Sequence, residues 1–354
     1  MKKKLLALFM VVVTAFSLTA CGAGASKEAA TDKEVAVEKE ETKTYKVGLV
    51  TDVGGVEDQS FNQSAWEGLQ RAEKELGVTV NYLPSNTDAD YGPNIETFVD
   101  EGYDLIVCVG YMLADATSTA AQQYPDQQFA IVDDISCVEY ENVACMSFRQ
   151  EQASYLVGYV AGMMSETDTV GLVLGMASDN MHLFGYGYCA GVMDANPNAK
   201  ILQANSNSFG DPALGATLAT NFITNNADVI FHAAAATGTG IISECDAKGI
   251  MAIGVDSDQN YLAPETVITS AMKRVDNAVY DTVERLVNGT LENGITVYDL
   301  SNEGVDIAPT TTLLSEEVIT AVEDVKAKIV SGEIEVPTNK EAFEGAYGEI
   351  YELD

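Results

Sequence analysis

The sequence has few basic residues and almost no histidine. Its 354 residues include 19 lysines and arginines against 54 aspartates and glutamates, which gives a formal net charge of −35. A chain this acidic repels the phosphate backbone of nucleic acids, so a nucleic-acid-binding function is excluded. The same charge disfavours contact with anionic membrane surfaces.

The residues and motifs of common catalytic sites are also scarce. The sequence has only two histidines, His182 and His232, no HExxH motif, and no spacing of ligand residues that suggests zinc. It contains no GxGxxG fingerprint, no GxSxG elbow and no P-loop. His232 stands in the apolar run VIFHAA and is expected to be buried rather than to act as a general base. These absences argue against an enzyme.

Cysteine is too sparse and too irregular for a full disulfide framework. After Cys21 an odd number of cysteines remains, and no two of them form a CxxC pair. Cys108, within DLIVCVG, is expected to be a buried and inert thiol. The remaining cysteines of the body are Cys137, Cys145, Cys189 and Cys245.

The N-terminal stretch has the features of an export signal. MKKK precedes the apolar run LLALFMVVVTAFSLTA, which is too short for a comfortable transmembrane helix. The run ends at LTAC, where a small residue precedes Cys21, and this arrangement resembles the lipobox of bacterial lipoproteins. The resemblance implies a lipoprotein signal peptide over residues 1–20, cleavage before Cys21 and lipid attachment to its sulfur. The alternative is an ordinary signal peptide followed by a chance cysteine.

Residues 21–44 are small and charged, without an aromatic residue. This composition is typical of a flexible tether. Together with the lipobox it places the expected protein on the extracytoplasmic face of the cell membrane, held by a lipid anchor.

From Tyr45 onward, short β-rich runs alternate with stretches of helical periodicity. Nearly continuous apolar runs between helices predict parallel sheets with helices on both faces. The runs are too many for one modest sheet, so the sequence predicts an α/β fold with two doubly wound parallel-sheet lobes. The first crossing between lobes is expected near Ser147–Tyr155. The predicted strands are YKVGLV, VTVNYL, DLIVCVG, QFAIVDD, VACMSF, VGLVLG, KILQANS, DVIFHAA, MAIGVDS and VITSAM.

Aromatic, acidic and lysine side chains follow several of these strands. Ligands of open α/β sheets bind beyond the carboxyl ends of the strands, so these side chains are candidate ligand contacts. An aspartate after a strand is often only a helix N-cap, and a phenylalanine there often belongs to the core. Several such residues together nevertheless indicate a binding site: Asp52, Phe61, Asp133, Asp134, Phe184, Tyr186, Tyr188, Phe209, Asp256 and Lys273.

Several stretches resemble the basic membrane protein (BMP) family. Members of this family are lipoproteins that serve as substrate-binding receptors of ABC-type importers, commonly for purine nucleosides. The resemblance spans nearly all of the chain from residue 45 onward, in the same order, and agrees with the lipobox. The stretches that carry it are GLVTDVGGVEDQSFNQSAWEGL, FAIVDD, FGYGYCAGV, AATGTG and AIGVDSDQ followed by VITSAMKRVDNAVYD.

More distantly, the layout resembles the ribose- and galactose-type periplasmic binding proteins. Their two lobes are joined by a three-strand hinge and close on the ligand by hinge motion. This resemblance implies an N-terminal lobe of residues 45–148 plus about 274–296, and a C-terminal lobe of residues 149–273 plus about 297–354. The resemblance to the BMP family also implies a monomer that is not an enzyme and that needs no cofactor or metal.

The family's binding pattern carries over to this sequence residue by residue. Phe61 matches an aromatic that stacks on the nucleobase, and Phe209 falls where a second aromatic closes over the ligand. Asp52 matches a polar contact of the first loop, and Asn62 is one of the polar neighbours of Phe61 that meet the base. Phe184 is also expected to line the site, although related sugar receptors place a polar contact there.

The sugar half of the expected site is acidic and carries one lysine. Asp133 matches an acid that accepts hydrogen bonds from the base or the sugar, and Asp256 and Lys273 match residues that hold the ribose hydroxyls. The family often has two glycines where this chain has Ala235-Ala236, and the two methyl groups are expected to narrow the sugar side of the pocket.

These residue types suit an uncharged nucleoside. A phenylalanine face stacks on a flat base, and a carboxylate accepts from paired ribose hydroxyls. A phosphate would require several basic residues, and only Lys273 and Arg274 lie near the strand ends. The implied partners are a purine nucleoside of the inosine, guanosine or adenosine type and the ABC permease subunits. The alternatives are a receptor of the same fold for a sugar, an autoinducer or an amino acid, a signalling receptor, and, less favoured, a nucleosidase or dehydrogenase.

Overall fold

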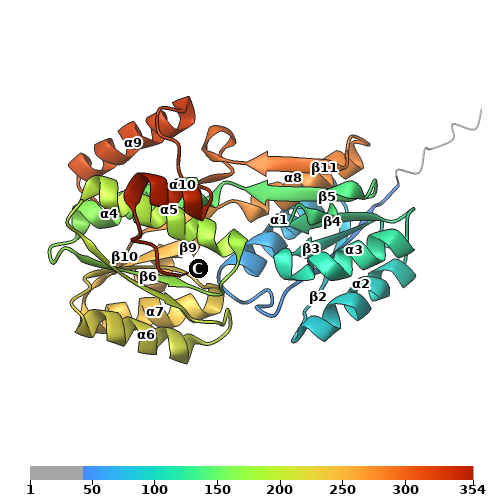
Figure 1. Cartoon of the computed structure of the whole chain (residues 1–354). Helices are drawn as coiled ribbons and strands as arrows, with labels where there is room; N and C mark the ends of the chain where they lie inside the picture. Colours follow the sequence, from blue (N-terminus) through green and yellow to red (C-terminus); the bar gives the residue numbers. More distant parts are fainter. Residues whose placement is uncertain (1–42, 354) are drawn as a thin grey trace, which may run out of the picture. The chain divides into compact units, whose positions relative to one another are not determined.

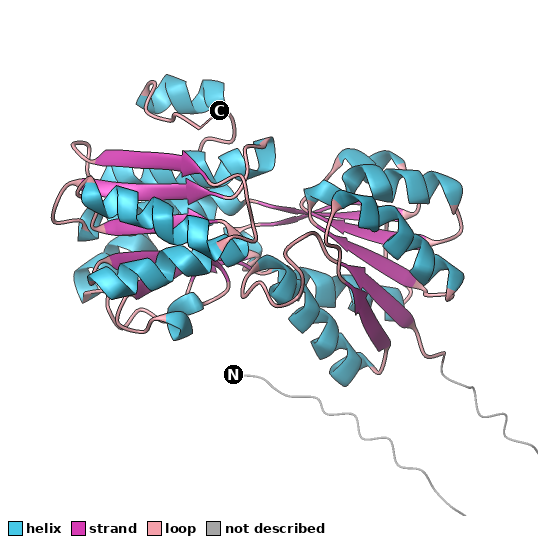
Figure 2. Cartoon of the chain, turned by 90° about the horizontal axis from the view of Figure 1, so that it is seen from below, coloured by secondary structure: helices cyan, strands magenta, loops and turns pink. Residues whose placement is uncertain are grey.

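Two six-stranded sheets organise the part of the chain that the computed structural model describes, residues 43–353. The first sheet has the order β11-β5-β4-β3-β1-β2 and the second the order β12-β10-β9-β8-β6-β7. All pairs in them are parallel except β10 with β12. Figure 1 and Figure 2 show helices on both faces of each sheet, which confirms the predicted α/β fold with two doubly wound lobes.

The strands of the first sheet are β1 (Lys46–Val50), β2 (Thr79–Leu83), β3 (Leu105–Val109), β4 (Gln128–Val132), β5 (Val143–Phe148) and β11 (Gly294–Tyr298). Those of the second are β6 (Thr169–Leu174), β7 (Lys200–Asn205), β8 (Val229–Ala233), β9 (Met251–Asp256), β10 (Val267–Lys273) and β12 (Val305–Ile307).

Every apolar run predicted to be a strand is one. The sequence pattern missed β11 and β12, because β12 is only three residues long and β11 is a half-exposed edge strand in which Ile295 and Val297 face solvent. The predicted lobe boundary at about residue 296 falls inside β11, whose pairing with β5 continues to Tyr298.

The helices cover the sheets in pairs. Buried residues of α1 and α8 share a core with one face of the first sheet, and residues of α2 and α3 pack on its other face. In the second sheet α4 and α5 cover one face, while α6 and α7 cover the other. The helices are α1 (Phe61–Leu76), α2 (Tyr91–Asp100), α3 (Ala114–Gln123), α4 (Gln150–Met164), α5 (Asp179–Ala195), α6 (Pro212–Thr224), α7 (Ala235–Lys248), α8 (Val275–Val287), α9 (Glu316–Ser331) and α10 (Lys340–Tyr347), and the short 3-10 helices are η1 (Asp88–Asp90), η2 (Tyr111–Leu113), η3 (Ser136–Glu139), η4 (Gln259–Leu262) and η5 (Leu300–Asn302).

The chain passes between the two sheets three times within this region. It leaves the first sheet at the end of β5 and enters α4. This crossing lies within the predicted stretch Ser147–Tyr155. It returns after β10 into α8, which packs against α1, and leaves again after β11. In both sheets the strand order reverses beside the first strand, between β1 and β3 and between β6 and β8. Such switch points leave a crevice at the carboxyl ends of the strands, where ligands bind.

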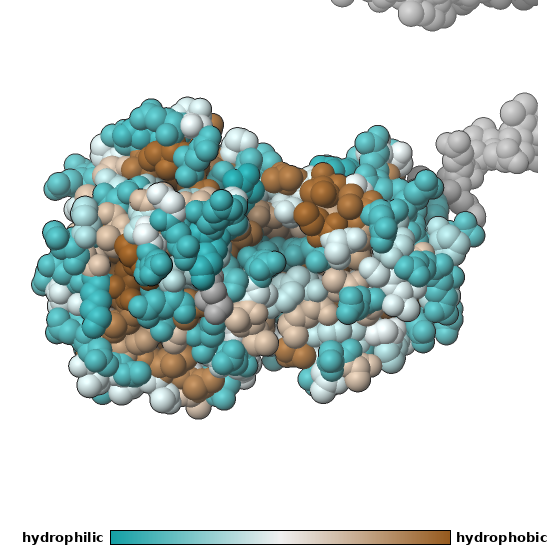
Figure 3. All heavy atoms as spheres, viewed as in Figure 1, coloured by the Kyte–Doolittle hydropathy of each residue, from teal (hydrophilic) through white to brown (hydrophobic). Residues whose placement is uncertain are grey.

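The cysteines and the surface agree with the composition. All five cysteines of the described region are free and buried, and burial raises the pKa of the Cys108 thiol to about 12, so this thiol is inert. Hydrophilic residues cover most of the face shown in Figure 3, and apolar residues form separate patches on it. Within residues 43–353, none of the helices combines the length and the apolar character that a bilayer span requires.

Helices α4 and α5 approach each other through glycines. A Cβ added at Gly158 would lie 2.2 Å from the backbone oxygen of Tyr188, and one added at Gly191 would lie 2.0 Å from that of Tyr155. Neither backbone oxygen can move without shifting its helix. The pair of helices therefore depends on the absence of a side chain at these positions.

We expect Gly158→Ala to lower the free energy of unfolding by about 1–3 kcal/mol, because the added methyl group overpacks a rigid contact. Urea unfolding measures this loss. Gly345→Ala on α10 is the matched control, since nothing lies within 4 Å of the added Cβ there. This control should leave stability unchanged or raise it by up to about 1 kcal/mol. Equal losses in both variants would contradict the close packing of α4 on α5.

Candidate functional site

A cavity lies at the carboxyl ends of both sheets and takes side chains from each. Of the residues that the sequence put forward, Asp134, Tyr186 and Tyr188 do not line it, whereas eight do: Asp52, Phe61, Asn62, Asp133, Phe184, Phe209, Asp256 and Lys273. Ala235, which the sequence analysis also named, lines the cavity as well. The sequence did not single out the remaining lining residues, which are Gly110, Tyr111, Asn180, Met181, Ala233, Ala234 and Val255. That these residues contact a ligand stays a prediction.

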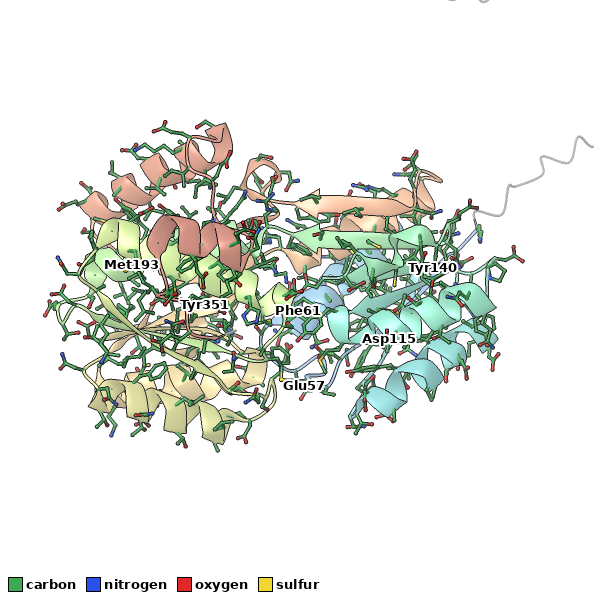
Figure 4. All side chains as sticks on the ribbon, in the orientation of Figure 1. Glu57, Phe61, Asp115, Tyr140, Met193 and Tyr351 are labelled. Carbon is green, nitrogen blue, oxygen red and sulfur yellow. The ribbon has the colours of Figure 1, made fainter. Side chains whose placement is uncertain are left out.

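The turn before α1 is built around Asp58. Its carboxylate accepts hydrogen bonds from the backbone N–H groups of Ser60, Asn62 and Gln63, at 2.9–3.0 Å. These are groups that the start of a helix leaves without partners, so Asp58 fixes where α1 begins. Glu57, labelled in Figure 4, is exposed. The two neighbouring acids of this turn are therefore a surface residue and a side chain that holds the start of the helix.

A hydrogen bond between Asn62 and Asp52 holds both side chains beside Phe61. The Asn62 amide donates to Asp52 Oδ1 at 2.7 Å and to Asp58 Oδ2 at 3.0 Å, and Gly54 N–H also donates to Asp52 Oδ1, at 2.9 Å. Both amide hydrogens of Asn62 are thus used, and its Oδ1 is left as an acceptor at the cavity. Burial raises the pKa of Asp52 to about 6, although the bonds from Gly54 and Asn62 oppose this shift.

Lys273 lies at the centre of the site. Its side chain is 2% exposed, and its ammonium makes an ion pair with Asp133. The same ammonium lies 5.1 Å from the ring centroids of Phe61 and Phe148 and 5.5 Å from that of Phe184. Three aromatic rings therefore stabilise the lysine charge, at distances where cation–π attraction is effective.

Asp256 ends β9 and accepts a hydrogen bond from the Ser60 hydroxyl, which comes from the first lobe. Burial raises the pKa of Asp256 to about 7. Lys273 and the Ser60 bond oppose this rise, whereas the charges of Asp58 and Asp133 add to it. Four buried carboxyl groups and one ammonium thus share this region, and burial is the main cause of the raised pKa of Asp256.

Phe209 is positioned by a loop that α7 holds in place. The hydroxyl of Thr237 donates to Ser208 O at 3.0 Å and accepts from Asp211 N–H at 2.9 Å, and Thr237 N–H donates to Phe209 O at 3.2 Å. A Cβ added at Gly175 would lie 2.1 Å from the Phe209 ring, so this ring requires a glycine at the end of β6. The TGTG stretch therefore supports the second aromatic of the site.

The start of α5 supplies Asn180, Met181 and Phe184. Phe184 lies four residues after Asn180, so the three side chains share one face of the helix. The Gln150 amide donates to Asn180 Oδ1 at 2.7 Å, which turns Asn180 Nδ2 toward Asp133, 3.4 Å away. The helical spacing of Asn180 and Met181 relative to Phe184 was the signal that sequence reasoning could have used.

Two tyrosines that follow Phe184 in the sequence do not reach the cavity. Tyr186 packs against Phe343 and Tyr351, with ring centroids 5.6 and 4.8 Å apart, and Tyr188 packs against Phe231 at 5.0 Å. Both belong to the core of the C-terminal lobe.

Three cavity residues have left-handed backbone conformations. The φ angles are 67° at Asp133, 64° at Asp256 and 46° at Ala235. Side chains other than glycine adopt this region at a cost, and such strain gathers at ligand sites. Of the two alanines that replace the glycines typical of the family, Ala235 lines the cavity, and Ala236 is not among its lining residues.

Hydrogen-bond acceptors dominate the unpaired groups of the cavity. Asn62 Oδ1 and Asp133 Oδ1 are buried and have no hydrogen-bond partner within residues 43–353. Buried polar atoms normally have a partner, so these two oxygens favour a ligand that brings donors. Lys273 is the one basic side chain among the described residues that line the cavity.

The sequence predicts that His232 is buried rather than a general base. It lies on β8 with no exposed surface, and burial lowers its pKa to about 4. A neutral, enclosed imidazole that is absent from the cavity lining does not serve a ligand there.

This geometry defines a class: a two-lobed α/β protein that binds a small molecule between its lobes. A family model described as "ABC transporter substrate-binding protein PnrA-like" (Bmp) matches residues 45–340. The chain belongs to this Bmp family, and since the family consists of substrate-binding proteins, it is a binding protein and not an enzyme.

Known proteins resemble the chain over most of its length. The CD4+ T-cell-stimulating antigen of Listeria monocytogenes is 39% identical over 361 residues, covering 95% of this chain and 99% of that protein. The ABC transporter nucleoside-binding protein BmpA of Lactococcus lactis subsp. cremoris is 35% identical, covering 83% and 89%. The crystal structure of an ABC transporter solute-binding protein from Aeropyrum pernix K1 superposes with a TM-score of 0.79 at 28% identity, covering 86% of this chain and 97% of that one.

The raised pKa of Asp256 predicts how stability without ligand depends on pH. The folded protein keeps this proton up to about pH 7, whereas an unfolded carboxyl releases it near the ordinary pKa of 3.8. Stability from this group is therefore complete below pH 3.8 and is lost as the pH rises through 7. Asp256→Asn stays neutral at every pH, so its advantage over the wild type should grow by about 1–4 kcal/mol between about pH 4 and 8.

Urea unfolding of ligand-free protein at a series of pH values measures this difference. The exposed Asp100→Asn variant is the control and should follow the wild-type curve. Asp52 contributes a similar loss that ends near pH 6 and remains in both proteins. Parallel curves for Asp256→Asn and wild type would show that Asp256 is ionised in the folded protein throughout this range.

Proposed function

We propose that this protein is a lipid-anchored, extracytoplasmic receptor of an ABC importer that binds a purine nucleoside in the cavity between its lobes. The proposal is supported by one observation: the cavity combines an aromatic ring with buried oxygen atoms that have no hydrogen-bond donor. Phe61 offers a flat face, and Asn62 Oδ1 and Asp133 Oδ1 await N–H or O–H groups. The Lactococcus relative, named a nucleoside-binding protein, supports the same ligand class.

The base would lie on the Phe61 ring. Base–aromatic stacking contributes about 1–3 kcal/mol per base. Asp52 and Asn62 lie beside this ring and offer carboxylate and amide oxygens. Purine bases carry N–H donors at their edges, so these oxygens would orient the base while stacking holds it.

The ribose would lie toward Asp256 and Lys273. A carboxylate accepts from two neighbouring hydroxyls, and a charge-assisted hydrogen bond contributes about 1.5–3 kcal/mol when water is excluded. The Ser60 hydroxyl already donates to Asp256 and Lys273 is already paired with Asp133. Ribose hydroxyls would join this existing network.

A phosphate would be rejected. Asp52, Asp133 and Asp256 surround the cavity against the single ammonium of Lys273. Each carboxylate that is ionised repels a phosphate, and the unpaired acceptor oxygens offer it no donors. The proposal is therefore specific for the nucleoside rather than the nucleotide.

Calorimetric titration against a panel of ligands tests the proposal. Wild-type protein should bind inosine, guanosine or adenosine more tightly than the free base, free ribose or the 5′-monophosphate. Phe61→Ala should weaken nucleoside binding by about 1–3 kcal/mol, roughly ten- to a hundredfold, because stacking is lost. Phe222→Leu on α6, away from the cavity, controls for general destabilisation and should leave the affinity unchanged.

Other rankings of this panel would decide against the proposal. Preference for free ribose would indicate a sugar receptor. Equal binding of base and nucleoside would mean that Asp256 and Lys273 do not recognise ribose. An unchanged affinity in Phe61→Ala together with a large loss of stability would make Phe61 a core residue.

The anchor rests on Cys21, which lies outside the described residues. Cys21→Ser should abolish lipid modification and release the protein from membranes, because the serine oxygen does not replace the cysteine sulfur as the acceptor. One acyl chain binds membranes only marginally, so two or more chains are expected on the wild type. Fractionation after a high-salt wash, with mass spectrometry of the N-terminal peptide, measures both. A serine variant that still sediments with membranes contradicts the lipoprotein assignment.

A further inference from the structure

The C-terminal segment Lys340–Leu353 runs along α5 from one end of the helix to the other. Near the end of α5, Tyr347 donates from its hydroxyl to Asp194 Oδ2 at 3.0 Å. Near the start, the Tyr351 hydroxyl and His182 Nδ1 share a hydrogen bond of 2.7 Å. Figure 1 shows α10 lying on α5, and Figure 4 shows Tyr351 beside this helix in the C-terminal lobe. The family model matches only as far as residue 340, so nearly all of this segment lies beyond it.

The segment is fixed at both of its own ends. Phe343 is completely buried in the main core. On either side of Tyr351, side chains of β7 bind the backbone: the Gln203 amide donates to Ile350 O at 2.8 Å, and the Asn205 amide donates to Leu353 O at 3.3 Å. The ring of Tyr351 therefore has a defined position against α5.

That position requires a glycine on the helix. A Cβ added at Gly185 would lie 2.4 Å from Tyr351 Cε2 and 2.6 Å from its hydroxyl oxygen. The ring of Tyr186 packs on Tyr351 as well, with centroids 4.8 Å apart. His182, Gly185 and Tyr186 thus form the face of α5 that meets the segment.

The cavity-lining residues of α5 alternate with this face along the same two turns. Met181 precedes His182 and Phe184 precedes Gly185, and both Met181 and Phe184 line the cavity. On the α4 side, Gln150 holds the first turn through Asn180. The start of α5 is therefore clamped between α4 and Tyr351, and any rotation of the helix would move Phe184.

We propose that Tyr351 and His182 are positioning residues for the ligand cavity: through their hydrogen bond, the C-terminal segment sets the position of Met181 and Phe184. This inference deepens the proposed function and rests on it for its affinity measurement. Neither Tyr351 nor His182 touches the cavity, so their effect passes through α5.

Two Tyr→Phe variants on the same segment separate this role from general packing. Tyr351→Phe removes the hydrogen bond at the cavity end of α5, and Tyr347→Phe removes one at the far end. We expect Tyr351→Phe to weaken nucleoside binding about threefold to tenfold, as for the loss of one hydrogen bond, and Tyr347→Phe to change it by less than about twofold. Urea unfolding of both variants compares their losses of stability.

A double-mutant cycle tests whether the two residues act as a pair. His182→Ala should also weaken binding, and the double variant His182→Ala, Tyr351→Phe should bind no more weakly than the worse single variant. Fully additive effects, or an equal loss of affinity in Tyr347→Phe and Tyr351→Phe, would overturn the proposal.

Hydrogen exchange provides a measurement that needs no ligand. Deuterium uptake in a peptide covering residues 178–186 should rise in Tyr351→Phe and stay unchanged in Tyr347→Phe, because only the first loosens the start of α5. Unchanged uptake in Tyr351→Phe overturns the proposal even if nucleosides bind. If the wild type binds no nucleoside, the proposed function fails, and the exchange experiment still decides this inference.

Discussion

The buried ion pair between Lys273 and Asp133 is the interaction on which the site depends. Lys273 ends β10 of the second sheet, and Asp133 follows β4 of the first, so the pair joins the two lobes. Burying an ammonium and a carboxylate costs several kcal/mol per ion unless each is compensated. Here the compensation comes from their mutual attraction and from the aromatic faces of Phe61, Phe148 and Phe184 around the ammonium. The lobes therefore meet where charge is buried.

The two sheets place these groups together because they repeat one topology. Each sheet has a switch point beside its first strand, and the lobes turn their carboxyl strand ends toward one cavity. The backbone accepts strain there, with left-handed conformations at Asp133 and Asp256. Well-packed elements in the rest of the fold, such as α4 and α5 with their glycine contacts, offset the cost of these strained conformations.

The sequence predicts much of this arrangement because parallel strands are buried on both faces and appear as continuous apolar runs. An edge strand such as β11 lacks that pattern, since its side chains alternate between solvent and core. The strand-end rule and the family resemblance together found eight cavity residues, because ligand contacts of this fold gather where strands stop. The sequence did not predict Met181, because a methionine on a helix is typical of the core. It also did not predict the hydrogen bond from Ser60 to Asp256, because these residues are 196 positions apart. Contacts of this kind exist only after the lobes have folded.

Charge selection follows from the same buried pair. Because Lys273 is paired with Asp133, the described residues that line the cavity include no free cation for an anionic ligand. Asp52 and Asp256 remain as acceptors, and burial raises their pKa values to about 6 and about 7. A neutral ligand that donates hydrogen bonds would favour the ionised form of both carboxyl groups. It would thereby offset the cost of burying their charges. An anion would meet the opposite response, and the formal charge of −35 would repel it before it arrived. The local acceptors and the charge of the whole chain thus favour the same class of small, uncharged, donor-rich molecule.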